Sequence, residues 1–214
     1  MTRAFSVSSF RTTAIVGALA ALTALSACAP LLIGGALVGG SMLAIDRRTS
    51  GTQVEDEAIE LKSINRVNEV TKDRGHVNIT SYNRQVLITG EVPAEADKTA
   101  VEQAVAKIEN VRSIVNELAI AGNSSLTARS NDAILTSKVK AGLVDAKDLQ
   151  ANAIKVVSER STVYLMGRLT EREAKRATDV ARSVSGVQKV VRVFETISES
   201  ELANLAAPPL EKKP

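Results

Sequence analysis

The sequence contains few aromatic residues, one cysteine and one histidine. Only 2% of its 214 residues are aromatic and none is tryptophan, so the surface offers few rings to stack on bases or sugars. A single cysteine excludes an internal disulfide framework and a multi-cysteine zinc site, and a single histidine excludes most histidine-based catalysis and metal binding. We therefore expect no enzyme, no cofactor, no metal site and no nucleic-acid partner, although the isoelectric point is near 9.1.

The remaining composition is typical of an ordinary globular protein. Hydrophobic residues make up 44% of the chain and charged residues 24%, which distinguishes it from disordered sequences. The length allows one or two domains. We expect a core of valine, isoleucine, leucine and alanine.

The first 28 residues have the pattern of a secretory signal. Arg3 and Arg11 precede an uncharged, mostly apolar run over 12–27, which ends in Leu25-Ser26-Ala27-Cys28. This tetrapeptide resembles the bacterial lipobox, which implies cleavage before Cys28 and acylation of its thiol, with palmitate among the acyl groups. Each buried CH₂ of an acyl chain contributes about 0.8 kcal/mol, so several chains hold a protein at a membrane.

Two alternatives compete with lipidation. The segment could be a plain signal peptide with an incidental cysteine, or a transmembrane helix, because no charge occurs over 12–45 and that length can span a bilayer. Pro30 and the glycine pairs at 34–35 and 39–40 interrupt the apolar run. These interruptions favour the lipoprotein interpretation.

The residue after the cysteine indicates where such a lipoprotein is sorted. Ala29 stands there in place of Asp, which under the Gram-negative sorting pattern indicates the periplasmic face of the outer membrane. We therefore expect a signal peptide over 1–27 and a lipidated, glycine-rich apolar tether over 28–50.

The rest of the chain contains an internal repeat. Two short apolar runs recur with an offset of 77 residues, 77–79 with 86–90 and 154–156 with 163–167. The repeat predicts two modules, over 51–121 and 129–198. A polar linker over 122–128 joins them, and 199–214 is expected to be a disordered tail.

Each copy predicts the same order of elements. A helix comes first, at about 55–70 and 131–143, and is followed by two short alternating strands, a second helix and a last β-branched strand at about 111–119 and 187–196. Because a strand, a helix and a further strand of one sheet require a crossover connection, the last strand is parallel to its neighbour. The predicted class is α+β, with two tandem αββαβ modules, each a three-stranded mixed sheet with two helices on one face.

The second helix carries the clearest helical signals. In copy two, Ala177, Ala181 and Val184 recur on one face, and Thr170 with Glu173 forms a capping-box pattern at the start. In copy one, Val101, Val105 and Ile108 form the equivalent buried face.

Three glycines fit this geometry. Gly90 and Gly167 are expected to end the second strand of each copy, where the chain turns into the crossover. Gly186 follows the second helix of copy two, where a left-handed residue is expected. Copy one has Asn110 there, the next best residue for that conformation.

This repeat resembles the BON domain, and its tandem arrangement resembles the dual-BON outer-membrane lipoproteins associated with cell division and envelope stress. The resemblance implies binding of anionic phospholipid through the second module, chiefly its first helix, and a role in envelope integrity. The segments that carry it are Gly51–Asp56, Ser130–Asp132, Thr136–Val139 and, most specifically, Leu165–Lys175.

The charge distribution supports the same assignment independently. Residues 55–121 contain 8 Lys and Arg against 12 Asp and Glu, a formal charge of −4, whereas 129–196 contain 13 against 8, a formal charge of +5. An anionic lipid surface attracts each nearby Lys or Arg by about 1 kcal/mol. Only the second module is therefore suited to anionic lipid.

The candidate lipid-binding residues lie on the first helix of the second module and on a basic group beyond its hairpin. The alternative is that the charges are a solvated face and that Ile134 or Leu135 belongs to the core. The proteins resembled have a Trp where this chain has Ile134, so an interfacial aromatic anchor is missing. The candidates are Ile134, Leu135, Lys138, Val139 and Lys140, with Arg168 and Arg172, and then Lys175 and Arg176, as the flanking group.

Several other residues have simpler explanations than a site. A lone histidine, His76, is expected to be a surface or turn residue. Glu171 and Glu173 resemble a carboxylate pair, but the cap explains Glu173 better. Tyr82 and Tyr164 are expected to flank the hairpins or pack on their outer faces.

Two classes of function follow. The first is a lipid-binding lipoprotein of the outer membrane, and the second is a periplasmic scaffold that docks envelope protein partners without lipid recognition. The oligomeric state and the preferred phospholipid do not follow from the residues.

Overall fold

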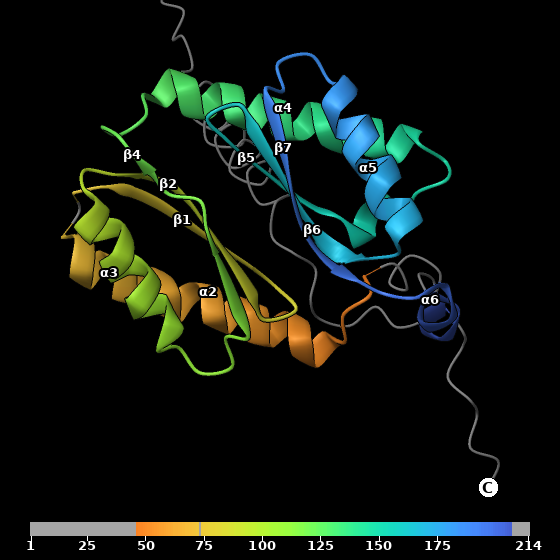
Figure 1. Ribbon diagram of the computed structural model, residues 1–214, viewed down its shortest axis with the longest axis horizontal. Coiled ribbons are helices and arrows are strands. Elements are labelled where there is room, and N and C mark those ends of the chain that lie inside the picture. Colours follow the sequence, from red (N-terminus) through yellow and green to blue (C-terminus); the bar gives the residue numbers. More distant parts are fainter. Residues whose placement is uncertain (1–45, 73, 207–214) are drawn as a thin grey trace, which may run out of the picture. The chain divides into compact units, whose positions relative to one another are not determined.

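The computed structural model describes residues 46–72 and 74–206 (Figure 1). The predicted αββαβ order is confirmed in both modules. The first module comprises α2 (Ser50–Thr71), β1 (His76–Tyr82), β2 (Gln85–Val92), α3 (Glu95–Ala106), β3 (Ser113–Asn116) and β4 (Ala119–Ile120). The second comprises α4 (Leu126–Asp145), the 3₁₀ turn η3 (Ala151–Ala153), β5 (Lys155–Glu159), β6 (Thr162–Leu169), α5 (Glu171–Ser183) and β7 (Lys189–Thr196), and α6 (Glu199–Ala206) follows.

Both sheets are mixed, as predicted. In the first module β2 is central, antiparallel to β1 and parallel to β3. The short β4 also pairs with β2 in parallel, so β3 and β4 share one strand position that is interrupted at 117–118. In the second module β6 is antiparallel to β5 and parallel to β7 over eight residue pairs.

Several predicted boundaries were wrong at the helix ends. Thr49 accepts a hydrogen bond from the backbone N–H of Thr52 and Ser125 from that of Ala128, so α2 and α4 begin earlier than 55 and 131. These side chains satisfy N–H groups that a helix start leaves open. The linker consequently ends at Ser125. Residues 199–206 form α6 instead of a disordered tail.

Alternate residues along the central strands divide the core between two faces. In β2, Val86, Ile88 and Val92 point to the side on which α2 and α3 pack, where Ile59 and Val101 complete the cluster. The same alternation in β6 directs Val163, Leu165 and Leu169 towards α4 and α5. Each module therefore has helices on one face of its sheet, as predicted.

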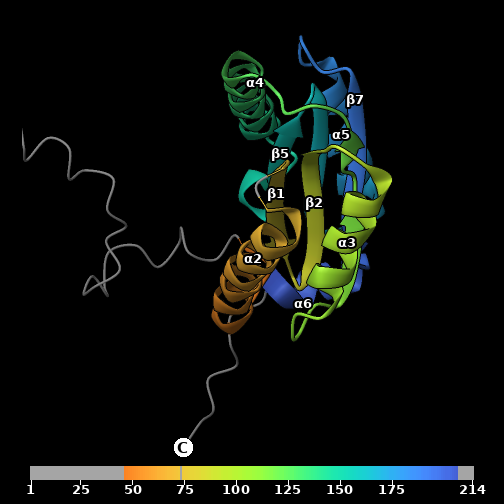
Figure 2. The ribbon, with the colours of Figure 1, turned by 90° about the vertical axis from the view of Figure 1, so that its left-hand side faces the viewer.

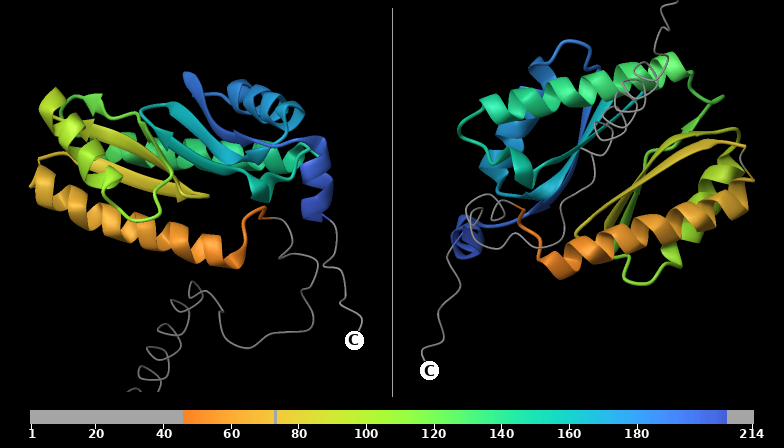
Figure 3. Two further views of the ribbon diagram at one scale, coloured as in Figure 1. Left: turned by 60° about the horizontal axis from the view of Figure 1, so that its bottom comes forward. Right: turned by 180° about the vertical axis from the view of Figure 1, so that it is seen from behind.

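The helix-free faces of the two sheets pack against each other. Leu87 points away from the helices of its own module and forms a buried cluster with Tyr82, Tyr164, Met166 and Val193. Figure 3 shows the strands of both modules between α2 on one side and α4 on the other. Fully burying one large apolar side chain contributes about 1.5–3 kcal/mol, so this third apolar cluster helps to hold the two modules together.

A buried aspartate on the first helix of each module holds the hairpin turn. Asp56 accepts the backbone N–H groups of Asn83 and Arg84, both at 2.8 Å, and Asp132 accepts those of Arg160 and Ser161, both at 2.9 Å. All four turn residues have positive φ, as a two-residue type I′ hairpin requires. The segments that carry the family resemblance thus include two structural aspartates.

Gly90 and Gly167 lie within strands and not at the turn that was predicted. β2 continues to Val92 and β6 to Leu169. A Cβ on Gly90 would lie 1.9 Å from the carbonyl oxygen of His76, and one on Gly167 would lie 2.6 Å from that of Ala153. Close backbone approach therefore explains these glycines, and Gly90 has a positive φ of 113° in addition.

The residues after the second helices adopt the left-handed conformation. Gly186 has a φ of 101° and Asn110 a φ of 67°. The side chain of Asn tolerates this region better than most others, which accounts for the exchange between the copies.

Candidate lipid-binding surface

Helix α4 packs one face against the core of the second module and turns the other to solvent. Leu135, Val139 and Leu143 lie on the inner face and are 6%, 0% and 1% exposed. The prediction that Leu135 and Val139 contact lipid was therefore wrong. The spacing of four residues between them is that of a core stripe, and the alternative that Leu135 belongs to the core holds.

The outer face of α4 carries three exposed apolar side chains. Leu126 is 80% exposed, Ile134 54% and Val144 66%. At 3.6 residues per turn they share an arc of roughly 80°, opposite the inner residues. Of the three, sequence reasoning selected only Ile134. Placing Leu135, Val139 and Leu143 inside would have identified Leu126 and Val144 as well.

Two lysines flank this arc. Lys138 and Lys140 are exposed, and neither has an ion-pair partner within the described residues 46–72 and 74–206. A hollow of about 330 Å³ borders the same side of the helix and is lined by Lys140, Val144 and Lys155 among others. Figure 1 shows α4 along one border of the second module, above β5 and β7. The arc and its lysines form what we call the α4 surface: Leu126, Ile134, Lys138, Lys140 and Val144.

Arg168 does not belong to this surface. Its side chain is 17% exposed and lies 2.5 Å from Glu201 of α6 and 3.5 Å from Glu195 of β7. It also donates to the backbone carbonyl of Arg47 at 3.1 Å. The prediction that Arg168 contacts lipid was wrong, because it points from the helix-free face of β6 into these partners.

The remaining basic candidates lie on α5. Arg172 is 59% exposed and lies 3.6 Å from Glu199, and Arg176 pairs with Asp148 at 3.0 Å. Lys175 is exposed. These side chains are accessible, but they come from another helix than the α4 surface, and Arg172 and Arg176 have acidic partners.

Sequence reasoning missed the residues that precede α2. Arg47 forms an ion pair with Glu173 of the second module at 2.7 Å, and Arg48 forms one with Asp56 of the first module at 2.7 Å. The Arg48 guanidinium also lies 4.3 Å from the centre of the Tyr82 ring. Residues 46–49 were expected to be part of a tether, but they connect both modules. No pattern in the sequence marks such long-range pairs.

These pairs shift the ionisation of both carboxyl groups. Burial alone would raise the pKa of Asp56, but hydrogen bonds from the Ser81 hydroxyl, the Arg84 N–H and the Arg48 guanidinium outweigh it and lower that pKa. Burial likewise opposes ionisation of Glu173, but hydrogen bonds from Arg47 and the Thr170 N–H lower its pKa below the ordinary value. The capping box at Thr170 and Glu173 forms as predicted, and Arg47 adds a charge to it.

The predicted membrane anchor, Cys28, lies outside the described residues, as do the signal peptide and most of the tether. Within residues 46–72 and 74–206, no helix has both the length and the apolarity needed to cross a bilayer.

Comparisons with known proteins agree with the repeat. The family model of the BON domain matches residues 55–122 and 131–197. The chain is 37% identical over 173 residues to the outer membrane lipoprotein DolP of Haemophilus influenzae, which covers 80% of this chain and 89% of the relative. It is 30% identical over 155 residues to a 21 kDa hemolysin of Actinobacillus pleuropneumoniae, which covers 72% of this chain and 80% of that protein.

Among solved structures, the C-terminal domain of CdsD from the type III secretion system of Chlamydia trachomatis is 11% identical. It covers 63% of this chain and 97% of that domain, with a TM-score of 0.28. A TM-score this low does not establish a shared fold. The two sequence relatives and the family model confirm the predicted resemblance, and the first relative is itself an outer membrane lipoprotein.

Proposed function

The chain belongs to the BON domain family, and on that premise we propose that its second module binds anionic phospholipid at the outer membrane, where acyl chains on Cys28 anchor the protein. The family is non-enzymatic, so the function is binding and not catalysis. Through lipid binding, the protein would support the integrity of the envelope.

One observation supports lipid binding above the others, namely the composition of the α4 surface. Leu126, Ile134 and Val144 expose apolar area that a bilayer interface would cover, and Lys138 and Lys140 lie at the two borders of that area. An amphipathic helix binds an anionic membrane through these two contributions, burial of the apolar face and attraction of the basic flanks. At about 1 kcal/mol per lysine, the flanks contribute about a thirtyfold gain in affinity.

On the equivalent helix of the first module the basic side chains have acidic partners, since Lys62 lies 3.6 Å from Glu109 and Arg66 lies 2.9 Å from Glu69. The exposed face of α2 carries Val54 and Leu61, which are 67% and 63% exposed, beside the exposed Glu57. With a formal charge of −4 over 55–121, this module is repelled by an anionic surface. Lipid binding is therefore assigned to the second module alone.

The anchor and the helix can reach the same membrane. The eighteen residue-to-residue steps from Cys28 to Asp46 span at most about 65 Å when extended. The acyl chains would then fix the location, and the α4 surface would respond to the lipid composition.

Flotation with lipid vesicles tests the proposal. The fragment 46–214 is suitable, because it lacks the anchor but keeps Arg47 and Arg48, which a fragment starting at Gly51 would lose. We expect retention on vesicles that contain phosphatidylglycerol, weak retention on vesicles of phosphatidylcholine alone, and a decrease as salt screens the lysines.

Two variants locate the binding surface. The double substitution Lys138→Glu with Lys140→Glu should lower the affinity by at least about thirtyfold. The matched control, Lys62→Glu with Arg66→Glu on α2, makes the same change in net charge and should retain most of the binding. Equal losses in the two variants would contradict the α4 surface, and retention that is independent of vesicle charge would favour the protein-docking scaffold.

A further inference from the structure

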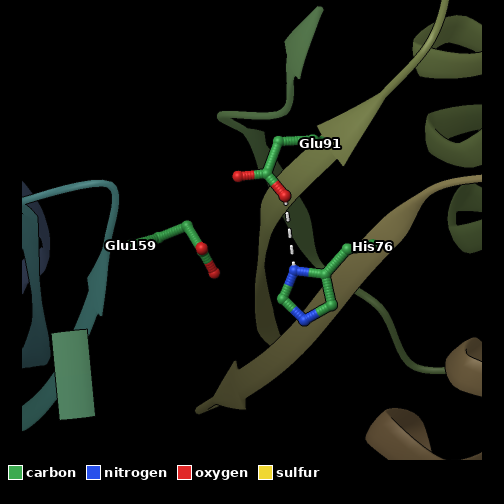
Figure 4. Close-up of side chains that lie close together, drawn as sticks. All are labelled: His76, Glu91 and Glu159. Atoms are coloured by element: carbon green, nitrogen blue, oxygen red, sulfur yellow. Dashed lines mark ion pairs between the residues drawn. The ribbon is translucent and has the colours of Figure 1, made fainter. Parts of the chain in front are cut away.

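Three side chains capable of binding metal meet where the two modules face each other. His76 and Glu91 are directly opposite residues of the β1–β2 pair, and Glu159 ends β5 of the second module. One ligand atom from each lies within 4.8 Å of the others. Figure 4 shows the carboxylate of Glu159 directed towards the Glu91 carboxylate and the His76 ring.

The carboxylate of Glu91 is buried with weak compensation. Its side chain is 0% exposed, and its polar contacts are long: 3.2 Å from the Ser124 N–H, 3.4 Å from Arg160 and 3.4 Å from Nδ1 of His76. A buried carboxylate with such contacts is costly, because removal from water is repaid only by short, well-aligned partners. Arg160 is a poor partner also because its side chain is 49% exposed.

The Glu159 carboxylate and Nδ1 of His76 are also buried, with few hydrogen-bond partners. Glu159 is 5% exposed, and the amide of Asn78 donates to one of its oxygens at 2.8 Å. Burial raises the pKa of Glu159, and the nearby charge of Glu91 raises it further against the lowering effect of Asn78. Nδ1 of His76 is buried and has no hydrogen-bond partner within the described residues.

We propose that His76, Glu91 and Glu159 bind one divalent transition-metal cation, of the Zn²⁺ or Mn²⁺ type, between the two modules. Ligand atoms at 2.0–2.2 Å from Zn²⁺ lie at most about 4.4 Å apart, so small side-chain movements close the site from its present spacing. One imidazole nitrogen with two carboxylates is a donor set for these cations, whereas Ca²⁺ and Mg²⁺ prefer oxygen ligands alone.

The surroundings suit a cation with three protein ligands and water. A hollow of about 370 Å³ is lined by His76, Glu159 and Asp132 and provides room for water ligands. Asp132 is not a fourth ligand, because its two oxygens accept the backbone N–H groups of the β5–β6 turn. Asn78 orients Glu159 in the way that outer partners orient metal ligands.

Such a cation would join the modules, because its ligands come from both. It also changes the expectation for His76, which is a site residue and not a plain surface residue. The sequence does not indicate that His76 lies next to Glu159, because the two residues are 83 positions apart along the chain.

Titration of the full-length protein with Zn²⁺ tests the site. Untagged protein in detergent micelles is suitable, because its single histidine makes the imidazole signals in ¹⁵N NMR assignable to His76 without further work. We expect binding of one equivalent, a shift of the Nδ1 resonance and a higher melting temperature, since a ligand that binds only the folded state stabilises it.

Amide substitutions separate a metal site from a merely structural cluster. Glu159→Gln and Glu91→Gln should each weaken Zn²⁺ binding by more than about a hundredfold, since even outer-shell changes cost 10–100-fold. Asp148→Asn, an exposed carboxylate on the same module, is the matched control and should bind like the unsubstituted protein. If Glu91→Gln prevents folding, Glu159→Gln decides, because its amide oxygen still accepts from Asn78.

The proposal is overturned if the His76 resonances do not respond to Zn²⁺ or if both amide variants bind as tightly as the control. Loss of vesicle binding has no bearing on it, because none of the three ligands lies on the α4 surface.

Discussion

In the first module the outer helix presents Val54 and Leu61 beside acidic side chains, and in the second it presents Leu126, Ile134 and Val144 between two lysines. The inner faces of the same helices correspond, with Ile59 and Val67 in one and Leu135 and Leu143 at the matching positions of the other. The repeat has therefore kept the residues that hold the fold and changed those that meet solvent. A duplicated module can acquire a separate surface function in this way without loss of stability.

The two modules also differ in the hydrogen bonds that hold each hairpin turn. Asp56 accepts from the Ser81 hydroxyl and the Arg48 guanidinium in addition to two backbone N–H groups, whereas Asp132 accepts from two backbone N–H groups. The first module thus depends more strongly on its aspartate, and through Arg48 it depends on the segment that precedes α2.

Among the predicted differences between the modules, we expect the largest loss of folding stability when these aspartates are replaced. Asp56→Ala should lower the free energy of unfolding by about 3–5 kcal/mol, because four donors lose a buried acceptor. Asp132→Ala should lower it by about 1–3 kcal/mol, since two backbone donors are left open. Urea unfolding followed by far-UV circular dichroism measures both. Equal losses would contradict the difference between the two hairpins.

We expect a smaller loss of folding stability when the strand glycines are replaced. Gly90→Ala should destabilise the protein by about 1–3 kcal/mol, and more than Gly167→Ala does. The first substitution forces a Cβ onto a backbone oxygen at 1.9 Å with a positive φ, whereas the second meets one at 2.6 Å. The melting temperatures of the two variants compare them. A larger fall for Gly167→Ala would show that the strained backbone of β2 relaxes easily.

The smallest effect is expected from mild acid. The pKa values of Asp56 and Glu173 are lowered in the folded protein, so the stability from these groups is present above the ordinary carboxyl range and is lost as the pH falls through the folded pKa values. Urea midpoints between about pH 7 and about pH 3 should therefore fall with pH.

One substitution in each module shows which of the two carboxyl groups causes the pH dependence of stability. Asp56→Asn and Glu173→Gln should each flatten the pH dependence, in addition to lowering stability near neutrality. If only Asp56→Asn flattens the pH dependence, the ion pair between Arg47 and Glu173 contributes little to stability. Residues 46–49 would then be held mainly by their contacts with the first module.

Most of the fold followed from local patterns. The apolar periodicity, the Thr170 and Glu173 cap and the repeat predict the αββαβ order, because helix and strand periods are properties of neighbouring residues. The helix ends were less predictable, since Thr49 and Ser125 compete with other polar residues nearby as caps. Within the candidate site, Ile134, Lys138 and Lys140 were predicted to be available and are exposed, whereas Leu135 and Val139 were assigned to the wrong side of the same helix.

The sequence by itself determined the two modules, their opposite charges and their family, because these depend on composition and on local spacing. Only the tertiary structure decided what lies between the modules. Leu87 and Tyr164 pack together, Arg47 reaches Glu173, and His76 faces Glu159. Each of these contacts joins residues more than 70 positions apart, and nothing in local spacing encodes which helix-free faces meet when two sheets pack together.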